Sequence, residues 1–295
     1  MKRNLWSRFR RFLPLPATLL LAGCHMALLD PAGPIGVAER SVLFTATGLM
    51  LLIVIPWRYR ASNTKAEYKH EWSNSNKIEA VMWSIPIAIV TVLAVICWRT
   101  SHELDPFRPI PSTHKPVRIE AVAMDWKWLF IYPGHNVATV NEIALPVGVP
   151  VVFHITSATV MNSFFIPRLG SQIYAMANMQ TADNLVASVP GTYRGISANF
   201  SGGGFSGMTF KVKAMSESDY QQWLAKVGSS TRKLDAKEYL ALDKPSSNVP
   251  VTYYGHVNPD LFGQILMGKL AAGRADVLAA TTVTSGAKTG ALRRD

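Results

Sequence analysis

The chain has 295 residues, which is long enough for one large domain with additions or for two domains. Hydrophobic residues make up 48% of the chain and charged residues only 17%, which argues against disorder and makes a fully soluble enzyme the less favoured class. The formal net charge of +11 is compatible with a nucleic-acid partner or with an anionic membrane, and the positions of the charges decide between the two.

The first 23 residues have the pattern of a secretory signal. Five basic residues without an acidic neighbour precede an apolar stretch over residues 12–22. The stretch ends in Leu21-Ala22-Gly23-Cys24, which resembles the lipobox of bacterial lipoproteins, where the signal is cut before a cysteine that carries a diacylglycerol. We predict a signal peptide over 1–23 and lipidation of Cys24, with an uncleaved signal anchor as the alternative. Cleavage would remove those five basic residues and lower the charge from +11 to +6, so the sequence does not favour nucleic-acid binding.

Two later apolar segments predict transmembrane helices. Residues 80–98 contain no charge, and at about 1.5 Å per residue they nearly match a hydrocarbon core of about 30 Å. Residues 41–57 are also uncharged but are at the lower limit for a span, so a hairpin that enters the membrane without crossing it is the alternative. The sequence thus supports a transmembrane helix over 80–98 more strongly than one over 41–57.

Basic residues predict the orientation of these helices. The loop 58–79 carries five lysines and arginines, whereas residues 24–40 carry one, so the positive-inside rule places 58–79 in the cytoplasm. Residues 24–40 then form a lipidated periplasmic segment, and everything after the second helix is periplasmic. A lipid anchor at Cys24 requires the same topology, and the protein is expected in the bacterial inner membrane.

A linker over 99–114 is predicted to lead into the periplasmic part. The pattern of that part predicts strands first and helices after them. Short apolar or alternating runs with Gly and Pro between them predict an all-β sandwich or small barrel over 115–214. Helical spacing predicts two helices, Ser216 to Val227 and Pro259 to Leu270, within a C-terminal helical region over 215–272. The tail over 273–295 is rich in Ala, Thr and Gly and is predicted to be disordered.

Several short patterns that could indicate a nucleotide-binding or metal-binding site have little support in this sequence. Residues 202–207 spell GxGxxG, but MTFKVKA follows and alternates like a strand, whereas a dinucleotide fingerprint needs a helix at this point. The seven histidines never fall close enough together to form a local ligand pair, and Cys24 and Cys97 cannot build a disulfide framework or a cysteine metal site. The residues alone therefore predict no metal site.

Longer motifs carry a specific resemblance. LLDPAGPIG, RYRASN, NKIEAVMWSIP, MDWKWLFIYP, MNSFFIPRLGSQIYAM and GFSGM lie in an order that closely resembles subunit II of bacterial cytochrome bo-type ubiquinol oxidase. The resemblance covers about residues 20–270. It implies two transmembrane helices, a cupredoxin-like sandwich and a haem–copper complex that oxidises ubiquinol, reduces oxygen to water and pumps protons. One departure is the first helix, which is roughly two turns shorter than is usual in the family.

The resemblance also implies that a copper centre has been lost. The sister family, subunit II of cytochrome c oxidase, holds two copper ions with two cysteines, two histidines, a methionine and a glutamate carbonyl. The corresponding positions here are Asn162, Ser197, Asn199, Ser201, Phe205 and Met208, of which only the methionine is retained. Because serine and phenylalanine cannot replace thiolate and imidazole, we expect no cofactor on this chain. Haem and copper are expected in the partner subunit I, through which quinol also reacts.

Two further roles follow from the resemblance. Glu79 would lie at the mouth of a proton channel into subunit I, while its spacing from Asn76 also fits a capping box that stabilises the helix start. Trp126 and Trp128 occupy the positions of electron-accepting aromatic residues in the sister family, but an aromatic pair in a strand more often packs a core.

Three functional hypotheses remain at this point. The leading one is a non-metallated structural subunit of a quinol oxidase, with subunit I, smaller membrane subunits and the bilayer as partners. The second is a free-standing lipoprotein whose cupredoxin-like domain binds a periplasmic ligand or a copper ion. The third is subunit II of a cytochrome c oxidase, which the missing thiolates oppose.

Overall fold

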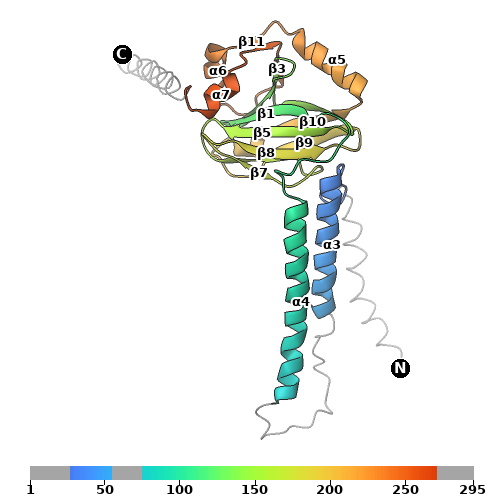
Figure 1. The fold of residues 1–295 in the computed structure, drawn as a ribbon. Helices are drawn as coiled ribbons and strands as arrows, with labels where there is room; N and C mark the ends of the chain where they lie inside the picture. The colour runs from blue at the N-terminus through green and yellow to red at the C-terminus, as the bar shows by residue number, and fades with distance from the viewer. Residues whose placement is uncertain (1–26, 55–74, 271–295) are drawn as a thin grey trace, which may run out of the picture.

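The computed structural model describes residues 27–54 and 75–270, which form a helical stalk below a β-rich head (Figure 1). The predicted signal peptide, Cys24, the last three residues of the predicted first span (55–57), residues 58–74 of the predicted cytoplasmic loop and the predicted tail lie outside the described residues. So does the apparent shortening after the first helix, which falls beyond Val54.

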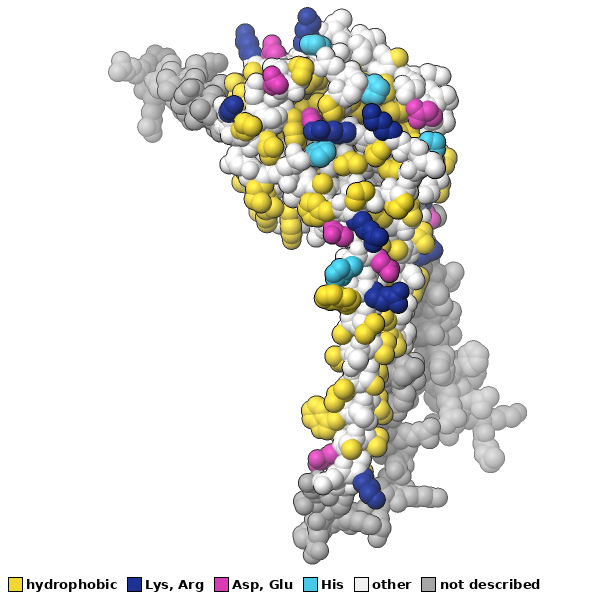
Figure 2. All heavy atoms as spheres, in the orientation of Figure 1, with side chains coloured by type: hydrophobic (Ala, Val, Ile, Leu, Met, Phe, Trp, Pro, Cys, Tyr) yellow, Lys and Arg dark blue, Asp and Glu magenta, His cyan; other side chains and the backbone are white. Residues whose placement is uncertain are grey.

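The stalk consists of α3 (Pro34–Val54) and α4 (Asn76–Glu103), which lie side by side (Figure 1). Helix α4 has 28 residues, none of them buried, and measures about 42 Å at 1.5 Å per residue. Figure 2 shows hydrophobic side chains along its exposed length, and Trp83 and Trp98 are 68% and 70% exposed. Among the described helices, α4 alone is long and apolar enough to cross a membrane.

Both stalk helices extend beyond the predicted apolar segments. Helix α3 begins at Pro34, a residue that suits the first helical position because its missing N–H would have no partner there. Helix α4 begins four residues before 80 and ends five residues after 98. These are limits of helical backbone, and the membrane limits stay predictions.

The head confirms the predicted all-β sandwich. One sheet has the strand order β12-β3-β2-β1-β5-β8 and the other has the order β4-β10-β9-β6-β7. The pairs β1–β5 and β4–β10 are parallel, and the other pairs within the two sheets are antiparallel. The strands are β1 (Val117–Met124), β2 (Lys127–Tyr132), β3 (Val137–Val140), β4 (Glu142–Pro146), β5 (Pro150–Ser157), β6 (Asn162–Phe165), β7 (Ile173–Ala175), β8 (Thr181–Val186), β9 (Gly191–Ser197), β10 (Thr209–Met215) and β12 (Thr252–Tyr254).

Aromatic side chains fill the space between the two sheets. Trp128 is fully buried, and its ring lies 5.4 Å from that of Phe164 and 5.8 Å from that of Phe210. Phe164 and Phe210 are themselves stacked at 5.3 Å. Such contacts add to the energy of apolar burial, so this cluster is the centre of the sandwich core. The core-packing interpretation of Trp128 is thereby confirmed.

The C-terminal region is less purely helical than predicted. Helices α5 (Glu217–Gly228) and α7 (Leu261–Leu266) match the two predicted helices, the second of them shortened, and α6 (Ala236–Leu242) was not predicted. The same region contributes β12, which pairs with β3, and a small sheet of β11 (Lys233–Leu234) and β13 (His256–Val257). A second buried cluster, which includes Tyr239, Tyr254 and Phe262, packs this region on the outer face of the six-stranded sheet.

Candidate functional site

Three of the six predicted copper-ligand positions converge at one end of the sandwich. Asn162 begins β6, Ser197 ends β9, and Met208 precedes β10, so the sheet register brings them together. The Asn162 Nδ2 group lies 3.3 Å from the Met208 sulfur, and the Ser197 hydroxyl donates to Asn162 Oδ1 and lies 3.2 Å from the same sulfur. All three side chains are at least nine-tenths buried. They form a closed cluster of mutual hydrogen bonds.

The other three positions lie outside this cluster. The Asn199 amide donates to the carbonyl of Met161 at 3.1 Å, and the Ser201 carbonyl accepts a 3.1 Å hydrogen bond from Trp126 Nε1. The ring of Phe205 packs edge-on against Phe200 at 5.6 Å. Each of these residues therefore stabilises the conformation of the loop between β9 and β10.

The donor groups do not fit a dinuclear copper centre. The cluster offers one amide, one hydroxyl and one thioether, whereas a pair of soft copper ions requires bridging thiolates. The polar atoms of Asn162 and Ser197 are also engaged with each other and with the Ser163 backbone N–H, which donates to Asn162 Oδ1 at 2.9 Å. Among residues 27–54 and 75–270, no group of three or more His, Cys, Asp or Glu side chains is placed to hold a metal ion.

The glycine-rich loop is packed against an indole and continues into a strand. A Cβ on Gly204 would lie 2.4 Å from the Trp126 ring, so only glycine fits under this side chain. Gly202 has φ +110°, a conformation that other residues rarely adopt. A single 3₁₀ turn, η1 (Phe205–Gly207), leads directly into β10, as the alternating sequence predicted. The loop thus lacks the helix start of a dinucleotide site.

Glu79 lies in the first turn of α4, at the end of the stalk far from the head (Figure 1). The side chain is exposed. The predicted capping box is wrong: the N-cap is Ser75, Asn76 is already helical, and no side chain caps the helix end. The Glu79 N–H instead donates to the Ser75 carbonyl at 3.0 Å. In the first turn, the carboxylate lies where the helix dipole favours a negative charge.

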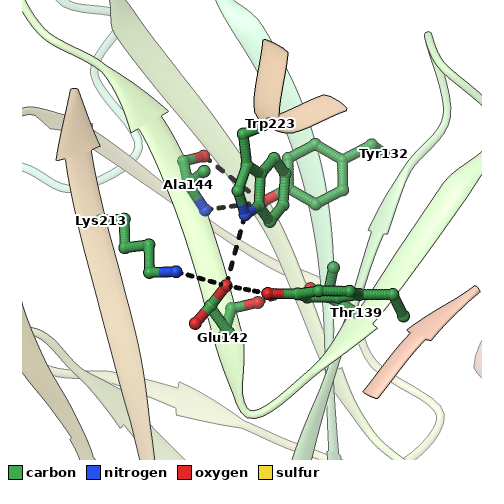
Figure 3. Close-up of polar contacts among 7 residues, drawn as sticks. Tyr132, Thr139, Glu142, Ala144, Lys213 and Trp223 are labelled. Atoms are coloured by element: carbon green, nitrogen blue, oxygen red, sulfur yellow. Dashed lines mark hydrogen bonds and ion pairs between the residues drawn. The ribbon is translucent and has the colours of Figure 1, made fainter. Parts of the chain in front are cut away.

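Glu142 is a buried carboxylate that sequence reasoning missed (Figure 3). Its Oε1 atom accepts hydrogen bonds from Tyr253 at 2.6 Å and Trp223 at 3.3 Å, and it pairs with Lys213 at 3.0 Å. Burial would raise the pKa of Glu142, but the hydrogen bonds from Tyr253 and Lys213 outweigh it and hold the pKa below its ordinary value. The only signal in the sequence was one acid in the apolar run of β4.

This carboxylate joins the sandwich to the C-terminal region. Lys213 lies on β10, Trp223 on α5 and Tyr253 on β12, so one oxygen connects three elements to β4. Beside it, the buried hydroxyl of Tyr132 accepts from the Ala144 N–H at 3.0 Å (Figure 3). Glu142 is therefore a structural group, because its contacts hold four elements of the fold together.

Known proteins match this chain over most of its length. The family described as COX Aromatic Rich Motif matches residues 229–268, the segment that contains α6, β12 and α7. Cytochrome bo(3) ubiquinol oxidase subunit 2 of Pseudomonas aeruginosa is 55% identical over 265 residues, which cover 87% of this chain and 80% of that protein. The Pseudomonas putida protein of the same name and ubiquinol oxidase subunit 2 of Acetobacter aceti are each 50% identical, with coverage of 88–91% on both sides.

A solved structure is also similar. The periplasmic domain of subunit II of cytochrome oxidase from Bradyrhizobium japonicum is 19% identical, with a TM-score of 0.37, and covers 39% of this chain and 96% of that one. Taken with the stalk and sandwich, the sequence relatives place the chain in the class of oxidase second subunits. Within this class, the chain belongs to the cytochrome bo(3) ubiquinol oxidase subunit 2 family.

Proposed function

We propose that this chain is the non-metallated second subunit of a proton-pumping quinol oxidase, in which it supports assembly and the entrance of a proton channel. The observation that carries the proposal is the 50–55% identity to ubiquinol oxidase second subunits, over most of both chains. The complex would oxidise ubiquinol and reduce oxygen to water at a haem- and copper-bearing subunit I.

The polar cluster at the end of the sandwich supports a scaffolding role. Asn162, Ser197 and Met208 satisfy one another and offer no thiolate, so the donor set gives the domain no copper centre that could accept an electron from cytochrome c. Reducing equivalents would then enter the complex as quinol, through subunit I. The head would cover the periplasmic face of that subunit, and the stalk would pack against its helices.

We further propose that both stalk helices cross the inner membrane and that a lipid on Cys24 anchors the N-terminus. Exposed apolar residues along α4 favour a lipid or protein environment for this helix, because side chains such as Trp83 and Trp98 would otherwise face water. Smaller membrane subunits would complete the assembly. The 50–55% identical quinol oxidase relatives favour this assembly over a free-standing lipoprotein.

Glu79 is the residue that we propose to act in proton uptake. It is exposed at the start of α4, at the end of the stalk that the predicted topology places at the cytoplasmic surface. An ionisable group at this level of a membrane protein can collect protons and pass them to a partner.

The substitution Glu79→Gln tests this role in the purified complex. We expect co-purified haem to be unchanged and quinol-dependent oxygen uptake to fall by about tenfold or more, as when a proton-transfer group is lost. Glu103→Gln, at the other end of α4, is the matched control, because Glu103 is exposed and makes only a 3.9 Å contact with Arg99. Equal turnover of the two variants would dismiss the proton role of Glu79.

The subunit assignment has its own test. A C-terminally tagged chain, extracted in mild detergent, should co-purify with haem and with quinol-dependent oxygen uptake. Purification of the chain alone would refute the assignment. A copper chromophore on this chain, reducible by a c-type cytochrome, would refute the non-metallated reading.

A further inference from the structure

The joint between the stalk and the head contains a buried acid that the proposed function leaves unexplained. Asp183 lies on β8, at the edge of the six-stranded sheet, and is only 3% exposed. Its cross-strand partner on β5 is Phe153, a core residue, so the carboxyl group shares the inner face of the sheet. Its Oδ2 atom has no hydrogen-bond partner among the described residues.

Both parts of the stalk attach at this strand (Figure 1). After α4, the Pro106 carbonyl accepts from the Asn184 N–H at 3.2 Å and from the Asn184 side chain at 2.8 Å. Before α3, the chain passes so close to β8 that a Cβ on Gly33 would lie 2.3 Å from the Val186 carbonyl oxygen. Asp183 therefore sits where both stalk segments meet the sandwich.

The first turns of α3 bring a second acid to the same place. Glu39 is half-buried, and its carboxylate accepts a 2.6 Å hydrogen bond from the Ser171 hydroxyl. Burial and the negative charge of Glu39 raise the pKa of Asp183 to about 7. No described lysine, arginine or histidine forms an ion pair with either acid.

The other titratable groups on the surrounding elements do not neutralise the negative charges of Asp183 and Glu39. Arg40, the neighbour of Glu39, donates to the Leu29 carbonyl. His154 on β5 pairs with Ala182 and so projects to the outer face, where it contacts Gln180. The remaining groups on the segments that pack against β8 are Tyr174 of β7, Asp105 and Arg108 after α4, and Asp30 before α3, which pairs with Arg168 at 2.7 Å; none of them is among the causes of the raised pKa of Asp183.

We propose that Asp183 and Glu39 form a proton-binding site at the joint between α3 and the sandwich, with the proton held by the Asp183 carboxyl group. A buried carboxylate is costly to ionise when one of its oxygens has no hydrogen-bond partner, and a second negative charge beside it raises the cost; the backbone hydrogen bond from Asn184 offsets only part of this cost. Binding one proton removes that cost and leaves Glu39 as the single charge. Loss of the proton places two negative charges between stalk and head that have no ion-pair partner among the described residues, so the joint is weakened as the pH rises.

Infrared spectroscopy of the intact detergent-extracted complex, with isotopically labelled aspartate, tests the site directly because a protonated carboxyl group absorbs apart from a carboxylate. We expect a protonated aspartate signal that disappears with a midpoint near pH 7. The signal should be absent from Asp183→Asn, which keeps the shape of the side chain, and unchanged in Asp260→Asn, whose acid is exposed. Glu39→Gln should move the midpoint to lower pH, since it removes the neighbouring charge.

Three results would overturn the proposal. The first is an identical pH response of the wild type and Asp183→Asn. The second is a midpoint that Glu39→Gln leaves in place. The third is a protonated signal that appears only after a chelator is added and is suppressed by calcium or magnesium, which would make this a cation site. Should Asp183→Asn fail to accumulate, the wild type and Glu39→Gln still decide the question, and none of these readouts depends on oxidase activity.

Discussion

The polar cluster around Glu142 and the cluster around Asn162 lie in the same sandwich, but they differ in charge and in the number of structural elements that they connect. Glu142 is ionised, and its partners come from β10, α5 and β12. Asn162, Ser197 and Met208 are uncharged and belong to the ends of adjacent strands and the turn between them. A buried charge is tolerated only where several hydrogen-bond donors offset the cost of removing it from water. Neutral polar groups carry a smaller cost, which a few mutual hydrogen bonds at the end of a loop can offset.

This difference predicts the largest loss of stability for Glu142→Ala. The change leaves Lys213, Trp223 and Tyr253 without their shared acceptor, and the buried Trp223 N–H is too enclosed to replace it fully with water. We expect the free energy of unfolding to fall by about 3 kcal/mol. Denaturant titration of the full-length protein in detergent measures it, and proteolysis should release the C-terminal region more readily.

A matched control for this prediction lies on α5, which also carries Trp223. Glu217 is exposed there and binds only Gln221, at 2.7 Å. Glu217→Ala should therefore change the free energy of unfolding by less than about 0.5 kcal/mol. Equal effects of the two substitutions would mean that the Glu142 cluster does not join the C-terminal region to the sandwich.

The charge of Glu142 also predicts a pH dependence. Its pKa is below the ordinary value in the folded protein, so the folded state holds the proton less readily than the unfolded state does. The stabilisation is fully present above the ordinary glutamate pKa of about 4.5 and is lost as the pH falls through the lower folded value. The difference in unfolding free energy between the wild type and Glu142→Gln should therefore stay constant above about pH 4.5 and shrink as the pH falls below it. A difference that stays constant as the pH falls below about 4.5 would contradict a lowered pKa.

The two clusters also show what the sequence could and could not predict. The β-rich character of residues 115–214, helix α4 and the two main C-terminal helices follow from local patterns of apolar residues, turns and caps, whereas β11, β12 and β13 were not predicted. Glu142 could not be assigned a role, because its partners Lys213, Trp223 and Tyr253 are 71, 81 and 111 residues away. The pairing of β12 with β3 is equally non-local.

The neutral cluster was located in a different way. The positions Asn162, Ser197 and Met208 came from the family resemblance, and their contacts with one another came from the sheet register. Nothing in the local sequence indicates that an asparagine 35 residues before a serine is bonded to it. Asp183 was missed for the same reason, because the group that acts on it, Glu39, lies in the stalk.

The smallest expected effect belongs to Ser197→Ala. The variant removes one hydrogen bond, but Asn162 Oδ1 still accepts from the Ser163 N–H, and the Asn162 amide still contacts the Met208 sulfur. We expect a loss of about 1 kcal/mol in unfolding free energy. Ser206→Ala, an exposed change in the loop after β9, is the control and should have almost no effect. A loss as large as that of Glu142→Ala would show that the uncharged cluster is a main support of the fold. In that case, the buried side chains of Asn162, Ser197 and Met208 would stabilise the whole sandwich and not only the end of one loop.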